Sequence, residues 1–223
     1  MKNKIITICF IAFGAFFGIE QSYACACGLP NLDAIKQQLI QYHDSGQYAK
    51  NQSAVAEKAI QYLKNRIASK QTSEKLAIVL DIDETALSNY RDMLTLRFGG
   101  TFADIVRAEG KGTDAVIKPT LELYRYAKAN KIAVFFITGR TESYRDATVK
   151  NLEDVGYKNW NGLVLKSENY HEKSAAPYKI NARKEIIQQG YNIVLDMGDQ
   201  DSDLIGGYTE KTFKLPNPYY LIP

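Results

Sequence analysis

The stretch Leu76-Ala-Ile-Val-Leu-Asp81-Ile-Asp83-Glu84-Thr85 decides the fold of this chain. Its first five residues are all apolar. Because such a run is too short for a buried helix, it predicts a strand covered on both faces, as in a parallel sheet. Asp81 then stands at the carboxyl end of the strand, where open α/β sheets bind their ligands. Two carboxylates so close together can divide a reaction, one as a metal-bound nucleophile and the other as a proton donor. A structural interpretation also stands, since Asp81 and Glu84 have the spacing of a helix capping box.

Apolar runs and helical periodicities alternate along the rest of the chain. The runs predict further strands at 131–137, 163–165, 191–195 and 212–215. Apolar residues at helical spacing predict helices at about 32–42, 53–67, 120–130, 142–155 and 180–189. Strands that alternate with helices build a parallel sheet with helices on both faces. We therefore expect one Rossmann-like α/β domain with extra helices at its N-terminal end.

Two further motifs bring polar side chains to the ends of predicted strands. Thr138-Gly139-Arg140 follows the strand at 131–137, and a hydroxyl beside a glycine can bring an oxygen and backbone donors to a phosphate. Arg140 could add charge there or form a surface salt bridge. Gly198-Asp199-Gln-Asp201-Ser-Asp203 follows the strand at 191–195. Mg²⁺ prefers such carboxylate oxygens, although an Asp-rich turn has the same composition.

These motifs, in this order, resemble those of the haloacid dehalogenase-like hydrolases. Asp81-Ile-Asp83-Glu-Thr-Ala-Leu-Ser-Asn89 resembles in particular subfamily IIIB, the acid phosphatase branch with bacterial class C acid phosphatases and plant vegetative storage proteins. A lysine at the start of a helix is that family's third motif. The Lys-x-x-x-Arg spacing of the branch favours Lys179 over its neighbours Lys173 and Lys184. The resemblance covers nearly all of the chain after residue 24 and implies a three-layer haloacid dehalogenase fold with a parallel central sheet.

The resemblance also implies a role for each motif residue. Asp81 is the expected nucleophile and Asp83 the expected acid and base. Thr138, Gly139 and Lys179 are expected to bind the phosphate. The expected cofactor is Mg²⁺, with ligands from both acidic motifs: Asp81, Asp83 through its backbone carbonyl, Asp199 and Asp203.

The implied function is a Mg²⁺-dependent acid phosphatase, which hydrolyses phosphomonoesters through an aspartyl-phosphate. Nucleoside monophosphates are among the candidate substrates. Two alternatives stay open. One is a storage or binding protein of the same fold with little activity, and the other is a phosphotransferase that passes the phosphoryl group to an acceptor alcohol.

The segment at about 91–120 is too long for a simple turn and too short for a domain of its own. We interpret it as a small lid over the active site, where substrate selectivity usually resides. Tyr90, Phe98 and Phe102 could stack on an aromatic leaving group or pack within the lid.

The two histidines and the two C-terminal tyrosines lie outside the motifs. His43 is near a predicted helix end, where it could be solvated or face the helix dipole, and His171 is in a loop. Neither histidine has another beside it that would indicate a catalytic role. Tyr219 and Tyr220 could pack near the site or simply pin the end of the chain.

Residues 1–24 are predicted to be a secretory signal peptide. Lys2 and Lys4 precede an apolar core, and Ser22-Tyr23-Ala24 is a small-x-small cleavage site. Residues 25–223 would then form one catalytic domain, either periplasmic or secreted.

Charge and cysteine content narrow the expected partners. The formal net charge of +3 is too small a surplus for a nucleic-acid footprint or a polybasic membrane patch. Cys25 and Cys27 are too close for an easy unstrained disulfide. They are free or intermolecular thiols, or one is lost on cleavage, or one is lipidated as in an outer-membrane lipoprotein. The expected partner is a small-molecule phosphomonoester, with a membrane involved only in the lipidated case.

Overall fold

The computed structural model describes residues 28–222. Among the described residues, 28–35 fall in one compact unit and those from Lys36 onward fall in a second. The described part of the first unit contains the start of helix α1 (Leu32–Asp44). The predicted signal peptide at 1–24 and the two cysteines that follow it lie outside the described residues. Within the described range, no helix combines the length and apolar character that a membrane span requires.

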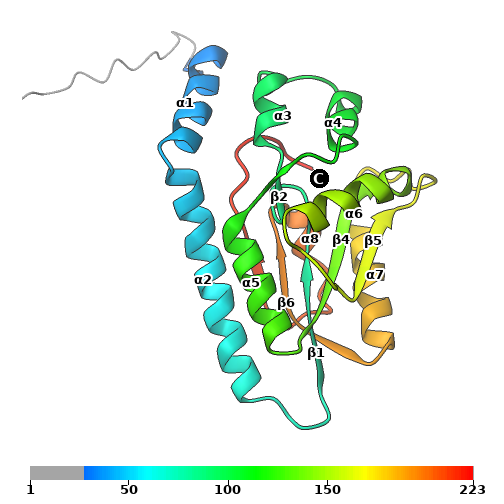
Figure 1. The fold of residues 1–223 in the computed structure, drawn as a ribbon. Helices are drawn as coiled ribbons and strands as arrows, with labels where there is room; N and C mark the ends of the chain where they lie inside the picture. The colour runs from blue at the N-terminus through cyan, green and yellow to red at the C-terminus, as the bar shows by residue number, and fades with distance from the viewer. Residues whose placement is uncertain (1–27, 223) are drawn as a thin grey trace, which may run out of the picture. The chain divides into compact units, whose positions relative to one another are not determined.

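Five parallel strands form the central sheet of the second unit (Figure 1). Their order in the sheet is β5 (Gly162–Lys166), β4 (Ala133–Thr141), β1 (Lys75–Leu80), β6 (Tyr191–Gly198) and β7 (Thr212–Lys214). β1 therefore pairs in parallel with β4 on one side and with β6 on the other. The carboxyl ends of these three strands meet at one edge, which brings the polar motifs together. The sheet confirms the predicted parallel α/β fold.

Helices cover both faces of this sheet and complete three layers. The covering helices are α2 (Gln47–Ala68), α5 (Lys118–Ala129), α6 (Arg145–Asp154) and α7 (Ala176–Gln188). Along β1, Ile78 and Leu80 pack into a core shared with α2, α5 and α6, while Ala77 and Val79 pack into a second core shared with α7. All of these side chains are buried, which is why the run shows no polar alternation in the sequence.

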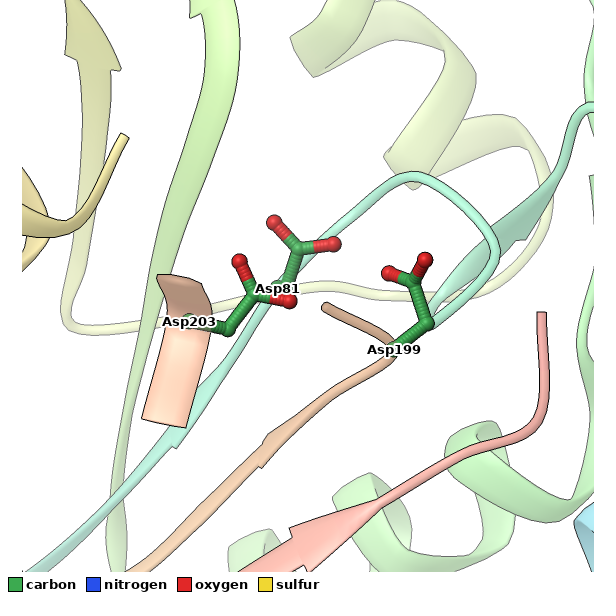
Figure 2. Close-up of side chains that lie close together, drawn as sticks. All are labelled: Asp81, Asp199 and Asp203. Carbon is green, nitrogen blue, oxygen red and sulfur yellow. The ribbon is translucent and has the colours of Figure 1, made fainter. Parts of the chain in front are cut away.

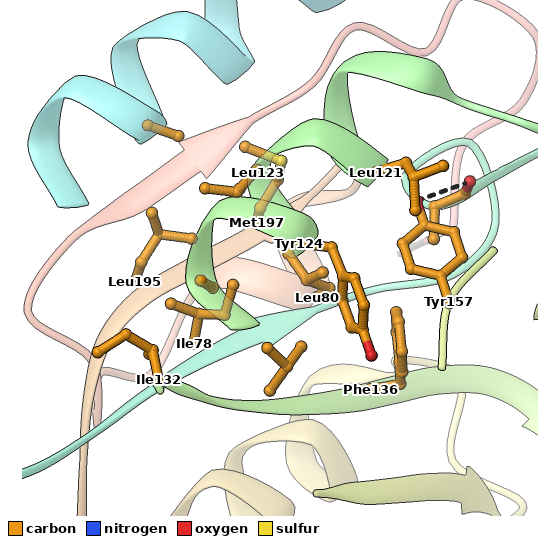
Figure 3. Packing of buried hydrophobic residues seen from close by; sticks show 14 of the residues in the cluster. Ile78, Leu80, Leu121, Leu123, Tyr124, Ile132, Phe136, Tyr157, Leu195 and Met197 are labelled. Carbon is orange, nitrogen blue, oxygen red and sulfur yellow. Dashed lines mark hydrogen bonds between the residues drawn. The ribbon is translucent and has the colours of Figure 1, made fainter. Parts of the chain in front are cut away.

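The larger core lies between the sheet and helices α2 and α5 (Figure 3). Phe136 on β4 is fully buried in it. The centroid of its ring lies 6.1 Å from that of Tyr124, 5.5 Å from that of Tyr157 and 5.9 Å from that of Trp160. Such edge-on and offset ring contacts add to the free energy gained by burying the rings.

Replacing Phe136 with Ala is expected to lower the free energy of unfolding by about 3–5 kcal/mol, because the lost ring leaves a cavity that its neighbours cannot fill. Urea denaturation of the variant and the wild type measures the difference. Leu94→Ala is the matched control, since Leu94 is 40% exposed and its loss should cost less than about 1 kcal/mol. A similarly small cost for Phe136→Ala would contradict the packing described here.

The segment expected to form a lid contains two short helices and one short strand. These are α3 (Tyr90–Thr95), α4 (Phe102–Glu109) and β3 (Ala115–Val116). β3 pairs antiparallel with β2 (Leu87–Ser88), which directly follows the first acidic motif. Ile105 and Glu109 on α4 line the same cavity as Asp81, so α4 lies over the carboxyl ends of the strands (Figure 1). α5 begins at Lys118, inside the range expected for the lid.

Two helices begin earlier than predicted. α2 starts at Gln47 rather than near residue 53, directly after Gly46, whose positive φ of 78° separates α2 from α1. α7 starts at Ala176 rather than at residue 180, with Pro177 in its first turn, where proline fits because the helix needs no N–H there. Each extension holds a single large aromatic residue, Tyr48 or Tyr178, so neither shows an apolar periodicity.

Candidate active site

Asp81 follows the last residue of β1, and its backbone N–H donates a hydrogen bond of 2.9 Å to the carbonyl oxygen of Met197 on β6. Its carboxylate contacts Lys179 in the first turn of α7, with 2.6 Å between Oδ1 and Nζ. The same ammonium lies 2.5 Å from Oδ1 of Asp203. All three side chains are buried, so their charges act strongly on one another.

Burial and mutual charge shift the pKa values of this cluster. Burial raises the pKa of Asp81 well above its usual range; Lys179 opposes that shift, and Asp203 and Asp199 add to it. Burial also raises the pKa of Asp199 to about 7, and the charge of Asp203 contributes. Burial alone would lower the pKa of Lys179, but the carboxylates of Asp203 and Asp81 raise it well above its usual value. The lysine therefore stays charged, whereas the raised pKa values of Asp81 and Asp199 favour their protonated forms as long as no further positive charge is bound.

Asp199 stands directly after β6 and is fixed by three other side chains. Its Oδ2 accepts hydrogen bonds from Nδ2 of Asn217, at 2.7 Å, and from Nε2 of Gln200. Its Oδ1 accepts a bond of 3.3 Å from Oγ1 of Thr85. The carboxylate is thus held at the sheet edge by the first acidic motif and the C-terminal segment together.

Asp203 belongs to the short helix α8 (Asp201–Leu204). Its Oδ2 accepts a hydrogen bond of 2.9 Å from the backbone N–H of Gln200. A Cβ atom at position 198 would overlap the Asp203 carboxylate, so Gly198 lets β6 approach Asp203 closely. The motif therefore needs glycine at position 198, because a side chain there would collide with Asp203.

Asp81, Asp199 and Asp203 lie close together (Figure 2), and one oxygen of each lies within 4.8 Å of the others. Two oxygen ligands of one Mg²⁺ ion lie at most about 4.2 Å apart, twice the Mg–O distance of about 2.1 Å, so small side-chain movements would bring the three around one ion. A divalent cation would also favour the ionised forms of Asp81 and Asp199, whose pKa values are raised by burial. The donor set and the raised pKa values therefore both fit a hard divalent cation.

Asp83 lies beside this cluster and is paired with Arg140, which is buried. Nε of Arg140 lies 3.1 Å from each oxygen of Asp83, and Nη2 lies 2.7 Å from Oδ1. Nδ2 of Asn89 donates to the same Oδ1 at 2.9 Å. Burial alone would raise the pKa of Asp83, but the charge and hydrogen bonds of Arg140, with that of Asn89, lower it below its usual value. Arg140 is therefore in a buried ion pair with the expected proton donor, not in a surface salt bridge.

The phosphate-binding candidates lie next to these carboxylates. Thr138 is buried, with Oγ1 3.5 Å from Oδ2 of Asp83, and Gly139 lines the cavity described below. Among the three lysines considered, Lys179 is the one that contacts Asp81. Lys173 is exposed at the cavity wall, and Nζ of Lys184 lies over the ring of Tyr208, 5.3 Å from its centroid.

A cavity of about 360 Å³ opens over these residues. Asp81, Asp83 and Lys179 line it on the side of the sheet. The lid contributes Ile105 and Glu109, and burial raises the pKa of Glu109 to about 8. The volume is in the range of sites that take a small organic ligand.

Glu84 does not form the capping box that its spacing allowed. Its Oε1 accepts a 2.5 Å hydrogen bond from the backbone N–H of Asn89, and its Oε2 accepts a 2.5 Å bond from the hydroxyl of Tyr48. The backbone N–H of Asp81 bonds to β6 instead. Burial raises the pKa of Glu84 to about 8. Glu84 therefore ties the acidic loop to α2.

The aromatic residues considered for substrate stacking pack against one another. The ring of Tyr90 lies 5.5 Å from that of Tyr219 and 6.3 Å from that of Phe98, between centroids. His43 stacks on Tyr90 with centroids 3.4 Å apart. The side chain of Phe102 is outside the description. This packing favours the structural alternative for Tyr90 and Phe98, and Tyr219 joins the same cluster.

The C-terminal segment forms one wall of the site. Tyr220 lines the cavity, and its hydroxyl donates a hydrogen bond of 3.1 Å to Oδ1 of Asn89. The backbone N–H of Ile222 donates to Oε1 of Gln200 at 3.0 Å. Tyr220 is thus the tyrosine of the pair that reaches the site, whereas His171 lies exposed in its loop.

Several residues that hold the site were not predicted. Asn89 and Gln200 lie within the motifs, so their position could have drawn attention to them. Asp114 pairs with Nη2 of Arg140 at 2.7 Å, and Asn217 bonds to Asp199. Both lie in loops, where a polar residue is ordinary and no periodicity marks it.

A parallel sheet between two layers of helices, with acidic side chains gathered at the carboxyl ends of β1 and β6, defines the class of the haloacid dehalogenase-like proteins. Within that class, the chain belongs to the haloacid dehalogenase (HAD) superfamily, subfamily IIIB (acid phosphatase), whose family model matches residues 27–223. The predicted resemblance is therefore confirmed, and membership agrees with the predicted phosphomonoesterase class.

Three plant proteins are similar to this chain. Acid phosphatase 1 of Solanum lycopersicum is 37% identical over 148 residues, which cover 65% of this chain and 58% of the tomato protein. The stem 28 kDa glycoprotein of Glycine max is 34% identical over 82% of this chain and 72% of its own length. Vegetative storage protein 1 of Arabidopsis thaliana is 30% identical over 80% of this chain and 67% of its own length. The family therefore holds both acid phosphatases and storage proteins.

A solved structure shares the fold. The class C acid phosphatase of Bacillus anthracis superposes with a TM-score of 0.70 at 24% sequence identity, covering 83% of this chain and 86% of that one. The likeness confirms the haloacid dehalogenase fold.

Proposed function

We propose that this protein is a Mg²⁺-dependent acid phosphatase that hydrolyses small phosphomonoesters through a phosphoryl group carried on Asp81. The observation that carries the proposal is the convergence of Asp81, Lys179, Asp199 and Asp203 at the edge of the sheet, under one cavity, in a chain of the acid phosphatase subfamily.

In the first half-reaction, a carboxylate oxygen of Asp81 attacks phosphorus as the bond to the leaving oxygen breaks, and Asp83 gives that oxygen a proton. In the second, Asp83 takes a proton from water as the water oxygen attacks phosphorus, which frees Asp81 and inorganic phosphate. Lys179 and Thr138 neutralise and orient the phosphoryl oxygens. A bound Mg²⁺, held by Asp81, Asp199, Asp203 and the Asp83 carbonyl, supplies positive charge where negative charge develops.

Asp83 must change its protonation state between the two half-reactions. Its pairing with Arg140 favours the carboxylate, the form that accepts a proton from water. A bound phosphate dianion nearby opposes that effect, since a like charge favours the protonated form that donates to the leaving group.

Removing divalent metal is expected to reduce the rate of nitrophenyl phosphate hydrolysis on the order of 100-fold or more. Added Mg²⁺ is expected to restore the rate. Binding should also be visible without turnover, because a ligand present at 100 times its dissociation constant raises the free energy of unfolding by about 2.7 kcal/mol. Thermal melting with and without Mg²⁺ measures this. Full activity after chelation would reject metal dependence, and a metal-stabilised protein without activity would favour the storage alternative.

The storage alternative has one specific support, the similarity to a vegetative storage protein. Against it, the expected nucleophile Asp81 is present and paired with Lys179. Phosphotransfer shares the same aspartyl-phosphate, so adding an acceptor alcohol and looking for a new phosphoester distinguishes it from hydrolysis. The cavity size suits a small leaving group, and nucleoside monophosphates remain candidates to be screened.

Export is also part of the proposal. Its supports are the signal-like pattern at residues 1–24 and a similar protein that is named a glycoprotein. N-terminal sequencing of protein recovered outside the cytoplasm tests cleavage near Ala24, and mass spectrometry of that terminus tests for a lipid on Cys25 or Cys27.

A further inference from the structure

Arg140 sits where β4 leaves its regular pairing with β5. The register of this pair shifts between Ile137 and Thr141. Such irregularities re-aim side chains and are common beside active sites. The backbone N–H of Arg140 donates to Oγ1 of Thr138 at 3.2 Å, and the Arg140 side chain is 0% exposed. The irregular end of β4 thus delivers a buried guanidinium to the edge of the sheet.

The guanidinium holds two carboxylates in fixed directions. Nε and Nη2 donate hydrogen bonds to the carboxylate oxygens of Asp83, at distances of 2.7 to 3.1 Å. Nη2 also donates to Oδ2 of Asp114 at 2.7 Å. The planar guanidinium, with its N–H donors in fixed directions, orients the carboxylates that it binds. The ammonium of a lysine is instead a point charge on a flexible stem.

The backbone of Asp114 is itself hydrogen-bonded to α6. Its backbone N–H donates to Oδ1 of Asn151 on α6 at 2.8 Å, and Nδ2 of Asn151 donates back to the Asp114 carbonyl oxygen at 2.9 Å. Gly112, with φ at +60°, lies so close to α6 that a Cβ there would be 2.7 Å from the carbonyl oxygen of Ala147. A line of contacts therefore runs from α6 through Asp114 and Arg140 to Asp83.

Asp83 needs such support. A proton donor must lie within hydrogen-bond reach of the leaving oxygen, and small misplacements cost much of the effect. Asp83 stands on the loop after β1 with 14% of its side chain exposed, and it lines the cavity. Hydrogen bonds from residues outside the cavity, such as those from Arg140, can fix the direction of its carboxyl group.

We propose that Arg140 is a positioning residue, which, anchored by Asp114, aims the carboxyl group of Asp83 at the leaving-group oxygen. The inference rests on the proposed function. Arg140 acts through Asp83 and does not itself touch the phosphate, so its loss should affect the proton transfer more than phosphate binding.

The test uses two substrates that differ in their need for a proton. Arg140→Lys keeps the positive charge and removes the planar guanidinium with its directed N–H donors. Turnover of an alkyl phosphate should fall on the order of 100-fold, while nitrophenyl phosphate, whose leaving group departs without a proton, should lose much less. Steady-state kinetics with both substrates measure the ratio. Equal losses for the two substrates would overturn the inference.

A double variant separates action through Asp83 from direct contact with the phosphate. If Arg140 acts through Asp83, then Asp83→Asn with Arg140→Lys should lose no more alkyl phosphate turnover than Asp83→Asn alone. A further loss on the order of tenfold, or a comparable weakening of inhibition by inorganic phosphate in Arg140→Lys, would show direct contact and overturn the positioning role.

Two other variants complete the design. Asp114→Asn leaves Arg140 and Asp83 intact and should show the same substrate bias to a smaller degree; it carries the test if Arg140→Lys does not fold. Arg145→Lys is the matched control, because Arg145 is 40% exposed and pairs with Glu142 at 2.7 Å away from Asp83. An inactive wild type would reject the proposed function and this role with it, whereas an active wild type with unbiased variants would reject only the role of Arg140.

Discussion

Asp81→Asn is expected to reduce phosphomonoester hydrolysis by on the order of 10⁴-fold or more while the protein stays folded. The amide of asparagine has nearly the shape of the carboxylate but cannot attack phosphorus. Burial already raises the pKa of Asp81, so replacing its charge with a neutral group removes repulsion from Asp203 and Asp199. Turnover of nitrophenyl phosphate and thermal melting, measured on the same preparation, check both halves of the expectation.

Asp201→Asn is the matched control for that variant. Asp201 belongs to the same acidic loop, but it is exposed and pairs with Lys214 at 2.5 Å. Its replacement should leave turnover unchanged. If Asp81→Asn kept substantial turnover, the assignment of Asp81 as nucleophile would be wrong, whatever its effect on stability.

Lys179→Met should produce the second largest effect. The variant removes the ammonium shared by Asp81 and Asp203, so two buried carboxylates lose their common partner. Breaking a buried ion pair from one side typically costs about 3–5 kcal/mol of stability. We also expect turnover to fall on the order of 10³-fold, because the charge that faces the phosphoryl group is lost. Urea denaturation and steady-state kinetics measure the two effects.

Lys173→Met and Lys184→Met serve as controls, because they change the two lysines that compete with Lys179 in the sequence. Lys173 lies exposed at the cavity wall and Lys184 lies over Tyr208. Both variants should keep the stability of the wild type within about 0.5 kcal/mol and keep most of the turnover. Loss of hydrolysis in either one with Lys179→Met active would move the phosphate-binding role to that lysine.

The framework of the site could be predicted because it rests on local signals. An apolar run of five residues is enough to identify a doubly buried strand, and the parallel sheet then places Asp81 and Asp199 at the same edge. The Lys-x-x-x-Arg spacing of the acid phosphatase branch then favoured Lys179 over its neighbours Lys173 and Lys184. The contact of Lys179 with Asp81 agrees with that choice.

The supporting contacts could not be predicted, for a physical reason. Arg140 was expected to follow β4, but the strand continues to Thr141 with a shift in register, and that shift depends on pairing with β5. Asp114 and Asn217 become neighbours of the site only through tertiary folding. A polar residue in a loop gives the same sequence signal whether it is solvated or holds a buried guanidinium.

The position of β1 in the middle of the sheet affects the order in which the protein folds. Ala77 pairs with Ala133, and Lys75 pairs with Tyr191, so the two neighbours of β1 come from distant parts of the chain. Long-range pairings of this kind form late and slowly. A ribosome-bound chain that ends before Tyr191 therefore lacks both β6, the partner strand, and Asp199, which directly follows β6. Regained turnover in a refolding experiment should accordingly trail the recovery of helical signal, and it would mark the moment when the sheet is complete.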